Sequence, residues 1–143
     1  LIPPEPARAV EARMLDRVFD NYVLANMQRG VNAHFLDLGN PMLGLRESPD
    51  PAEVEAGKAG LRRAYSWLEQ WLETHDLSPH PSLVSCAAAP ALFYADWVES
   101  ISSEHPRLAA LRAELLALPA VSRCVEDARP YRPWFPPGAP DRD

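Results

Sequence analysis

The residues that favour β-strands are almost missing from this chain, and this constrains its fold more than any other feature of the sequence. The chain contains 21 alanines and 18 leucines, but only nine valines, two isoleucines and one threonine. Alanine and leucine are among the best helix formers, whereas β-branched residues predominate in strands. The composition therefore predicts an all-α protein and excludes a β-sandwich, a barrel or a parallel sheet. At 143 residues the chain has the size of one domain.

Apolar residues recur at helical spacing in five segments. They predict helices over residues 6–32, 51–74, 83–101, 106–118 and 119–128. In the first segment two adjacent rows, Val10-Met14-Val18-Tyr22 and Leu15-Phe19-Val23, predict a wide buried stripe. Asp50 before Pro51 is a strong start for the second, and Gly57 and Gly60 mark a face that another helix can approach closely.

The first half of the third predicted helix is small and apolar, so we expect it to be buried on all sides. Pro90 lies inside it and removes a backbone hydrogen bond, which predicts a kink. Cys86, within this run, and Cys124, in the fifth helix, are expected to be small buried residues with reduced thiols.

Residues 129–143 contain five prolines and form a tail distinct from the helical part, residues 1–128. The tail carries Tyr131, Trp134 and Phe135, so we expect it to pack back on the helices.

Composition and motifs also exclude several functions. A net charge of −6 argues against a nucleic-acid-binding protein, which would show a basic face. No apolar run reaches the roughly 18 residues of a membrane span, and no signal peptide is visible, which predicts a cytoplasmic protein. Phosphate-binding glycine loops, nucleophile elbows and metal-binding motifs are absent from the sequence, and the four histidines lack the spacing of helical metal ligands. We therefore expect no metal and no cofactor bound by this chain.

Tyr22, Asn26 and Met27 are the candidate ligand-binding residues. A ring and an amide four residues apart on one helix, beside a methionine, could line a ligand cleft. Tyr22 also continues an apolar row, so a core role is the alternative. The aromatic residues Phe93, Tyr94 and Trp97 are interpreted as core rather than as a stacking platform.

Several segments resemble the C-terminal domain of glutathione S-transferases, in order along essentially the whole chain. Residues 82–98, Ser-Leu-Val-Ser-Cys-Ala-Ala-Ala-Pro-Ala-Leu-Phe-Tyr-Ala-Asp-Trp-Val, resemble the buried helix of that domain. Residues 105–108 resemble the entry to its next helix, and residues 118–123, Leu-Pro-Ala-Val-Ser-Arg, the turn into its last helix. Residues 126–132 resemble a tail common in bacterial members, and residues 1–3 the linker between the family's two domains.

The resemblance implies a five-helix bundle that forms the second half of a two-domain enzyme. A thioredoxin-like first domain, outside this sequence, would bind glutathione and supply the activating residue, so no catalytic residue is assigned here. The helical half would supply a wall of the hydrophobic co-substrate pocket and part of a homodimer interface. The partners implied are glutathione and a small hydrophobic electrophile.

One position departs from the family's pattern. The buried helix of the family usually begins with Ser or Thr followed three residues later by Asp, whereas this chain has Ser82 and Ser85. Because serine is shorter and uncharged, the capping box is expected to be weaker by about 0.5–2 kcal/mol.

Two other functions remain open on the sequence alone. The same fold can serve as a non-catalytic interaction module in protein assemblies, and an unrelated helical bundle could match by composition. An unrelated up-and-down bundle would have no reason for a proline within an alanine-rich buried helix.

Overall fold

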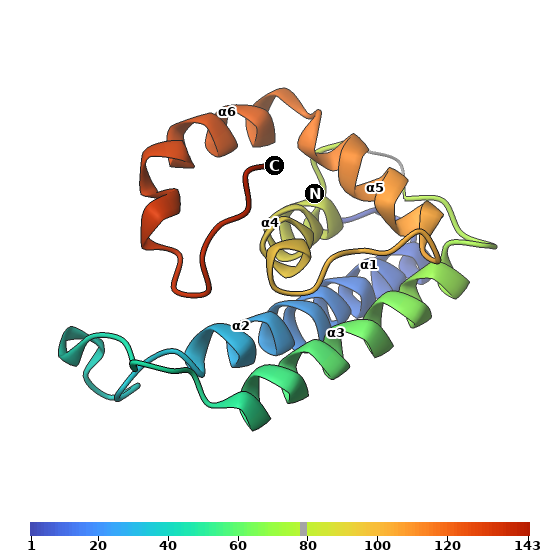
Figure 1. Ribbon diagram of the computed structural model, residues 1–143. Coiled ribbons are helices and arrows are strands. Elements are labelled where there is room, and N and C mark those ends of the chain that lie inside the picture. Colours follow the sequence, from blue (N-terminus) through green and yellow to red (C-terminus); the bar gives the residue numbers. More distant parts are fainter. Residues whose placement is uncertain (78–79) are drawn as a thin grey trace.

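The structure is a computed structural model that describes residues 1–77 and 80–143. Its elements, which Figure 1 shows, are α1 (Pro6–Val18), the π-helical segment η1 (Phe19–Leu24), α2 (Ala25–Asn32), the 3₁₀ turn η2 (Pro41–Leu43), α3 (Pro51–Trp71), α4 (Leu83–Val98), α5 (Pro106–Leu116), α6 (Pro119–Ala128) and the 3₁₀ segment η3 (Arg129–Trp134). Because α1, η1 and α2 follow one another without a break, the described residues form the five predicted helices. The all-α prediction is confirmed over this part of the chain. The segment Ser78-Pro79-His80-Pro81 is expected to separate the second and third helices, and its residues 78 and 79 lie outside the described residues.

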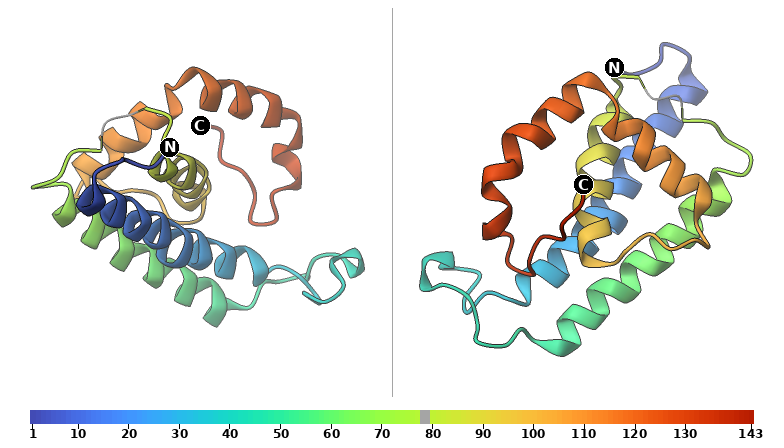
Figure 2. Two further views of the ribbon diagram at one scale, coloured as in Figure 1. Left: turned by 180° about the vertical axis from the view of Figure 1, so that it is seen from behind. Right: turned by 45° about the horizontal axis from the view of Figure 1, so that its top comes forward.

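The long helix made of α1, η1 and α2 lies alongside α3 (Figures 1 and 2). The helix α4 packs against α1 and η1 and is covered on another side by α5. The core fills the space among these helices and includes Leu15, Phe19, Val23, Leu61, Tyr65, Leu68, Leu92 and Leu108.

The π-helical segment explains which apolar row of the first helix is buried. The core row runs at a strict spacing of four residues, Leu15-Phe19-Val23-Met27-Val31, and all five side chains are buried. In a regular α-helix such a row turns by about 40° at each step. The wider π turn in the middle removes part of this drift and keeps the row on the core.

The prediction of a wide buried stripe on the first helix is therefore wrong in part. The second row is exposed: Val10 keeps 66%, Met14 41% and Tyr22 60% of its accessible surface. Only the row from Leu15 to Val31, which runs through the π segment, lies in the core. Val18 is half-buried.

The glycines of α3 lie where the two long helices touch, as predicted. A Cβ atom on Gly57 would lie 2.8 Å from the Asn26 carbonyl oxygen and 2.9 Å from the Gly30 nitrogen. A Cβ on Gly60 would overlap the Asn26 side chain, 2.0 Å from Oδ1. Helix α3 starts with Asp50 accepting from the Ala52 and Glu53 backbone N–H groups. Glu53 does not reach back to this cap but pairs with Arg29 at 2.6 Å.

Helix α4 begins with a complete capping box. The Ser82 N–H donates to Ser85 Oγ at 2.8 Å and the Ser85 N–H donates to Ser82 Oγ at 3.1 Å, so serine reaches as far as the box requires. The buried Ser85 hydroxyl also donates to the His80 carbonyl oxygen at 2.8 Å. The helix continues through Pro90 and ends at Val98, three residues before the predicted end, where Asp96 Oδ1 accepts from the Ile101 N–H at 2.7 Å. The kink at Pro90 stays a prediction.

The last 25 residues, 119–143, form a segment that we call the C-terminal arm. It arches away from the bundle and returns with the chain end near α4 (Figures 1 and 2). Neither α6 nor η3 contains a fully buried residue. The expectation that Cys124 is buried is thus wrong, because it is exposed, whereas Val121 and Val125 of the same helix are half-buried.

Because the arm stands off, one face of α4 is left uncovered. Cys86 and Pro90 lie on this face and are exposed, which corrects the expectation that the first half of the helix is buried on all sides. The same geometry corrects the expected burial of both cysteines.

Candidate functional site

An aromatic cleft of about 310 Å³ lies where α2, α4 and the C-terminal arm meet. Its lining includes Met27 and Val31 from α2, Phe93, Tyr94 and Trp97 from α4, and Tyr131, Arg132, Trp134 and Phe135 from the arm. The ring centroid of Trp97 lies 4.7 Å from that of Phe93 and 5.2 Å from that of Phe135. Offset and edge-on rings at such distances attract each other and offer an apolar, π-rich surface. The cleft therefore suits a flat apolar molecule.

Arg132 and Trp97 are two of the residues with polar groups that line this cleft. The Arg132 guanidinium carbon is 5.2 Å from the centre of the Trp97 ring, within cation–π range. The indole N–H of Trp97 is buried and has no hydrogen-bond partner among the described residues. Buried donors are normally paired, so an unpaired N–H at this position is unusual.

The last two residues of the arm, Arg142 and Asp143, both form ion pairs. Asp143 pairs with both Arg129, at 2.6 Å, and Arg132. Burial raises the pKa of Asp143, but hydrogen bonds from the two guanidinium groups outweigh it and hold that pKa below its usual range. Farther along α4, Arg142 pairs with the buried Asp96, which also lies 3.3 Å from Arg112. Burial lowers the pKa of Arg112. The Arg142–Asp96 pair thus ties the arm to the bundle, whereas the pairs of Asp143 lie within the arm.

A second hollow, which we call the apolar groove, adjoins the cleft between α4 and α6 and has a volume of about 500 Å³. Its walls are two stripes of small and apolar residues. From α4 come Ser85, Cys86, Ala89, Pro90, Phe93 and Tyr94, and from the segment ending in α6 come Leu116, Leu118, Pro119, Ala120, Val121, Cys124, Val125 and Ala128, with Pro81 at one end.

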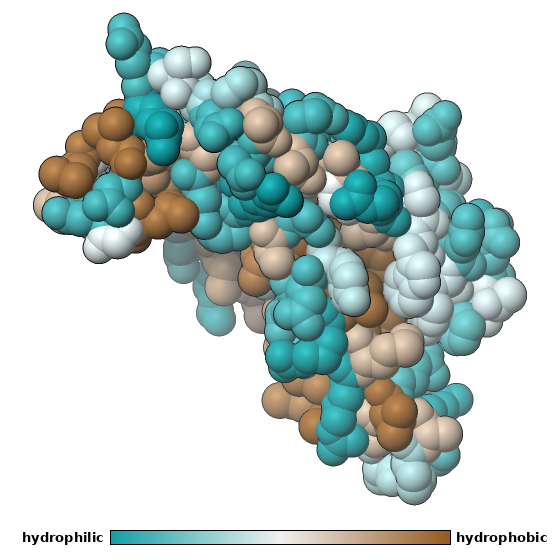
Figure 3. Space-filling view, turned by 90° about the horizontal axis from the view of Figure 1, so that it is seen from below, coloured by the Kyte–Doolittle hydropathy of each residue, from teal (hydrophilic) through white to brown (hydrophobic). Residues whose placement is uncertain are grey.

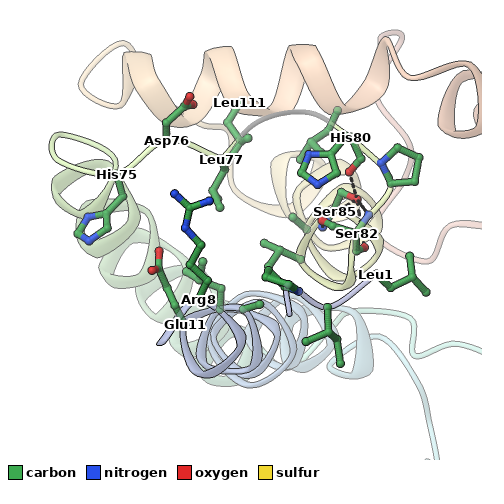
Figure 4. Close-up of a pocket in the computed structure, with 18 of the residues that line it drawn as sticks. Leu1, Arg8, Glu11, His75, Asp76, Leu77, His80, Ser82, Ser85 and Leu111 are labelled. Atoms are coloured by element: carbon green, nitrogen blue, oxygen red, sulfur yellow. Dashed lines mark hydrogen bonds between the residues drawn. The ribbon is translucent and has the colours of Figure 1, made fainter. Parts of the chain in front are cut away.

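A third hollow of about 750 Å³ lies at the opposite end of α4, between the start of the chain and the segment after α3. In Figure 4 Arg8 extends from α1 into this space, beside Glu11 and Leu77, while Ser85 and Ser82 join His80 on the other side. The polar groups come from separate loops and helix ends and do not converge on one point. We therefore place the candidate site at the aromatic cleft.

The structure separates the three residues that the sequence suggested. Met27 is buried and lines the aromatic cleft. Asn26 packs against Gly60, and its side-chain nitrogen donates to the Tyr22 carbonyl oxygen at 2.7 Å, within the π segment. Tyr22 is exposed and is not among the residues that line the hollows described above. The geometry thus brings only Met27 to the cleft.

Sequence reasoning did not single out Arg132 or Trp97 as cleft residues. Phe93, Tyr94 and Trp97 were interpreted as core, whereas only Phe93 is fully buried and all three line the cleft. The signal that could have found them is the second aromatic cluster in the tail, because two unconnected aromatic clusters in one small domain often meet.

Metal ligation and membrane insertion receive no support. Within residues 1–77 and 80–143, no group of three or more His, Cys, Asp or Glu side chains is placed to hold a metal ion. Over the same residues, none of the helices combines the length and apolar character that crossing a bilayer requires.

Comparison with known proteins supplies one match. Residues 51–114, which cover α3, α4 and most of α5, match the family model of the glutathione S-transferase C-terminal domain. No curated protein and no solved structure gives a significant match. The matched stretch includes the capped, proline-containing helix α4 on which the resemblance was first drawn, and the observed five-helix architecture agrees with it. Residues 51–114 therefore match a glutathione S-transferase C-terminal domain, and the helical fold of the described residues is consistent with that match.

Proposed function

We propose that the chain is the helical half of a glutathione S-transferase and that it holds a hydrophobic electrophile for conjugation to glutathione. In this reaction a glutathione thiolate attacks an electrophilic carbon of the co-substrate and a leaving group departs, or a conjugated double bond is saturated. A thioredoxin-like domain preceding this chain would bind glutathione and activate its thiol. The part of the helical half is to bring the electrophile close in a fixed orientation.

The aromatic cleft is the observation that carries this proposal. Its rings provide an apolar surface for a flat co-substrate. The Trp97 N–H is buried and unpartnered, so a small movement of that ring would let it donate to a nitro or carbonyl oxygen. Met27 belongs to this wall. Tyr22 and Asn26, the other wall candidates on the same helix, lie outside the lining of the cleft, so their part in binding stays a proposal. The enzyme is proposed to work in the cytoplasm.

The exposed row on the first helix supports a homodimer. Val10, Met14 and Tyr22 leave a line of apolar side chains in water, and such surfaces commonly mark contacts between chains. Sedimentation of the natural gene product, compared with Met14→Glu, tests this: the variant is expected to shift a dimer toward monomer.

The main proposal is tested by measuring the mass and the activity of the natural gene product. Its intact mass is expected to exceed 15.9 kDa by a domain of about 50 or more residues. That product is expected to conjugate glutathione to 1-chloro-2,4-dinitrobenzene.

Trp97→Phe, which keeps a ring but removes the N–H, is expected to raise KM for the electrophile and leave KM for glutathione unchanged. Tyr22→Ala against Met27→Ala separates the wall candidates by the same measurement. A product without glutathione turnover would overturn the proposal.

One observation favours a second function, that of a non-catalytic interaction module. The loop between α2 and α3 exposes large apolar side chains, Leu36, Leu38, Met42, Leu43 and Leu45, and they gather where the molecule protrudes at the left of Figure 3. The loop is ordered by backbone bonds from Leu36 to Gly44 and from Arg46 to His34. A full-length product that contains a folded thioredoxin-like domain but lacks turnover would favour this function.

A further inference from the structure

The apolar groove brings two thiols to one hollow. Cys86 lies on the α4 wall and Cys124 on the facing α6 wall, and both are free and exposed. They are 38 positions apart in the sequence, so it is the fold that places both on the walls of one groove.

The walls of the groove select the chemistry of an occupant. Its lining contains no Asp, Glu, Lys, Arg or His side chain, and its volume of about 500 Å³ lies within the range of small-molecule sites. A charged molecule would lose its hydration here without a counter-charge, whereas an apolar molecule gains from the burial of its surface.

The helix supplies one polar feature on the same wall. Pro90 has no N–H, so the Cys86 carbonyl oxygen lacks the donor that a regular helix gives it four residues later. Pro90 is exposed on the groove side, and it leaves this acceptor next to the Cys86 thiol.

We propose that the groove is a covalent binding site for apolar, uncharged α,β-unsaturated carbonyl compounds, which add to Cys86 or Cys124. The thiolate sulfur forms a bond to the β-carbon of the alkene, and the π electron pair moves to give an enolate. The enolate then takes a proton from water at the α-carbon, so the thiol proton is in effect transferred to carbon and no oxidant is needed. The proposal concerns the chain's own thiols and does not rest on the glutathione reaction.

Because both thiols face one hollow, a bulky adduct on either sulfur fills the space in front of the other. The site is therefore expected to accept one bulky apolar molecule per chain, although it holds two thiols. A small neutral reagent such as iodoacetamide is expected to modify both.

The kinetic test compares N-phenylmaleimide with N-(4-carboxyphenyl)maleimide on the intact chain, followed by intact mass. The ratio of the two rate constants, divided by the same ratio for N-acetylcysteine, is expected to be about tenfold in favour of the apolar reagent. The observed rate is expected to saturate with N-phenylmaleimide and to fall when N-phenylsuccinimide, which has no alkene, is present. A linear dependence on concentration with the selectivity of N-acetylcysteine would overturn the proposal.

Variants locate the reaction. Cys86→Ser and Cys124→Ser are each expected to leave one apolar addition per chain, and the double variant none. Val121→Asp puts a charge on the groove wall and is expected to abolish the preference for the apolar reagent, whereas Ser122→Asp, its exposed neighbour outside the lining, should not. N-pyrenylmaleimide is expected to add once. Two independent additions of this bulky reagent would show that the thiols do not share one site and would overturn the proposal.

Discussion

The helical bundle of α1 to α5 and the C-terminal arm are held by different forces. In the bundle Phe19, Leu61 and Leu92 are fully buried, whereas α6 and η3 have no buried residue at all. The arm is held instead by Phe135 against α4 and by the ion pair of Arg142 with Asp96. Burial contributes most of the free energy of folding, whereas exposed ion pairs contribute little and are screened by salt. The comparison implies that the arm can open while the bundle stays folded.

The largest loss of unfolding free energy is expected when a buried side chain is removed from the core of the bundle. Phe19→Ala removes a fully buried ring from the centre of the first helix and should lower the free energy of unfolding by about 3–5 kcal/mol. Val125→Ala, on the half-buried face of α6, should cost less than about 1 kcal/mol. Urea unfolding followed by far-UV circular dichroism measures both. Similar losses in the two variants would mean that the arm is part of the cooperative core.

The same division explains how much of the fold the sequence could predict. Helix starts such as Asp50-Pro51 are local, so the helix limits were close to those observed. The π segment was not predicted, although the strict four-residue spacing from Leu15 to Val31 was a signal for it. Burial of Cys86 was wrong because it depends on where α6 lies, and that position is fixed by contacts far along the chain.

The candidate site was less predictable for the same reason. Met27 could be proposed from one helix, but Trp97 and Arg132 meet only when the arm folds back over α4. Asn26 seemed a ligand-binding group by its type, and its amide is instead engaged by the Tyr22 carbonyl that the π segment presents. Periodicity reports which face of a helix is apolar, and it does not report which distant segment covers that face.

Gly57→Ala tests the contact between the two long helices. The new Cβ would meet backbone atoms of Asn26 and Gly30 at 2.8 and 2.9 Å, and backbone cannot move aside as a side-chain end can. The variant should lose about 1–3 kcal/mol of unfolding free energy. Gly39→Ala is the matched control, because Gly39 lies in an exposed loop and its Cβ would meet only the Asp37 side chain. An unchanged stability of Gly57→Ala would contradict the observed helix contact.

Glu69 makes part of the bundle sensitive to acid. It reaches from α3 to the start of α5, where Oε2 accepts from the Leu108 N–H at 2.9 Å and Oε1 from the Arg107 N–H at 3.1 Å. Burial raises the pKa of Glu69, but these two bonds and the Arg107 guanidinium outweigh it, so the pKa lies below its usual value. Its stabilisation is therefore complete above the unfolded-state pKa of about 4.3 and is lost as the pH falls through the folded-state pKa.

Glu69→Gln should cost about 1–3 kcal/mol at neutral pH, because the amide keeps one neutral acceptor and turns an NH2 donor toward the other backbone N–H. The difference from the natural chain should shrink as the pH is lowered below about 4. Urea unfolding at a series of pH values measures it, with Glu73→Gln, an exposed neighbour on the same side, as the control. A difference that does not change with pH would show that the Glu69 charge is not involved.

Arg142→Ala should have the smallest effect on global stability and the clearest effect on the arm. Its Nη2 atom donates to the Asp96 carbonyl oxygen at 2.9 Å and to Ser100 Oγ at 3.1 Å, so it ties the end of the arm to α4. Asp96 keeps Arg112 at 3.3 Å when Arg142 is removed, and the global loss should stay below about 1 kcal/mol. Backbone amides of α6 and η3 should exchange with solvent several-fold faster, while those of α3 and α4 should not change.

Arg123→Ala, an arm arginine with no ion pair among the described residues, should change neither group of amides. High salt should have a smaller effect than Arg142→Ala, because Asp96 is buried and its pair with Arg142 is only partly screened. Equal exchange in α6 and α4 would mean that burial, and not charge, holds the arm.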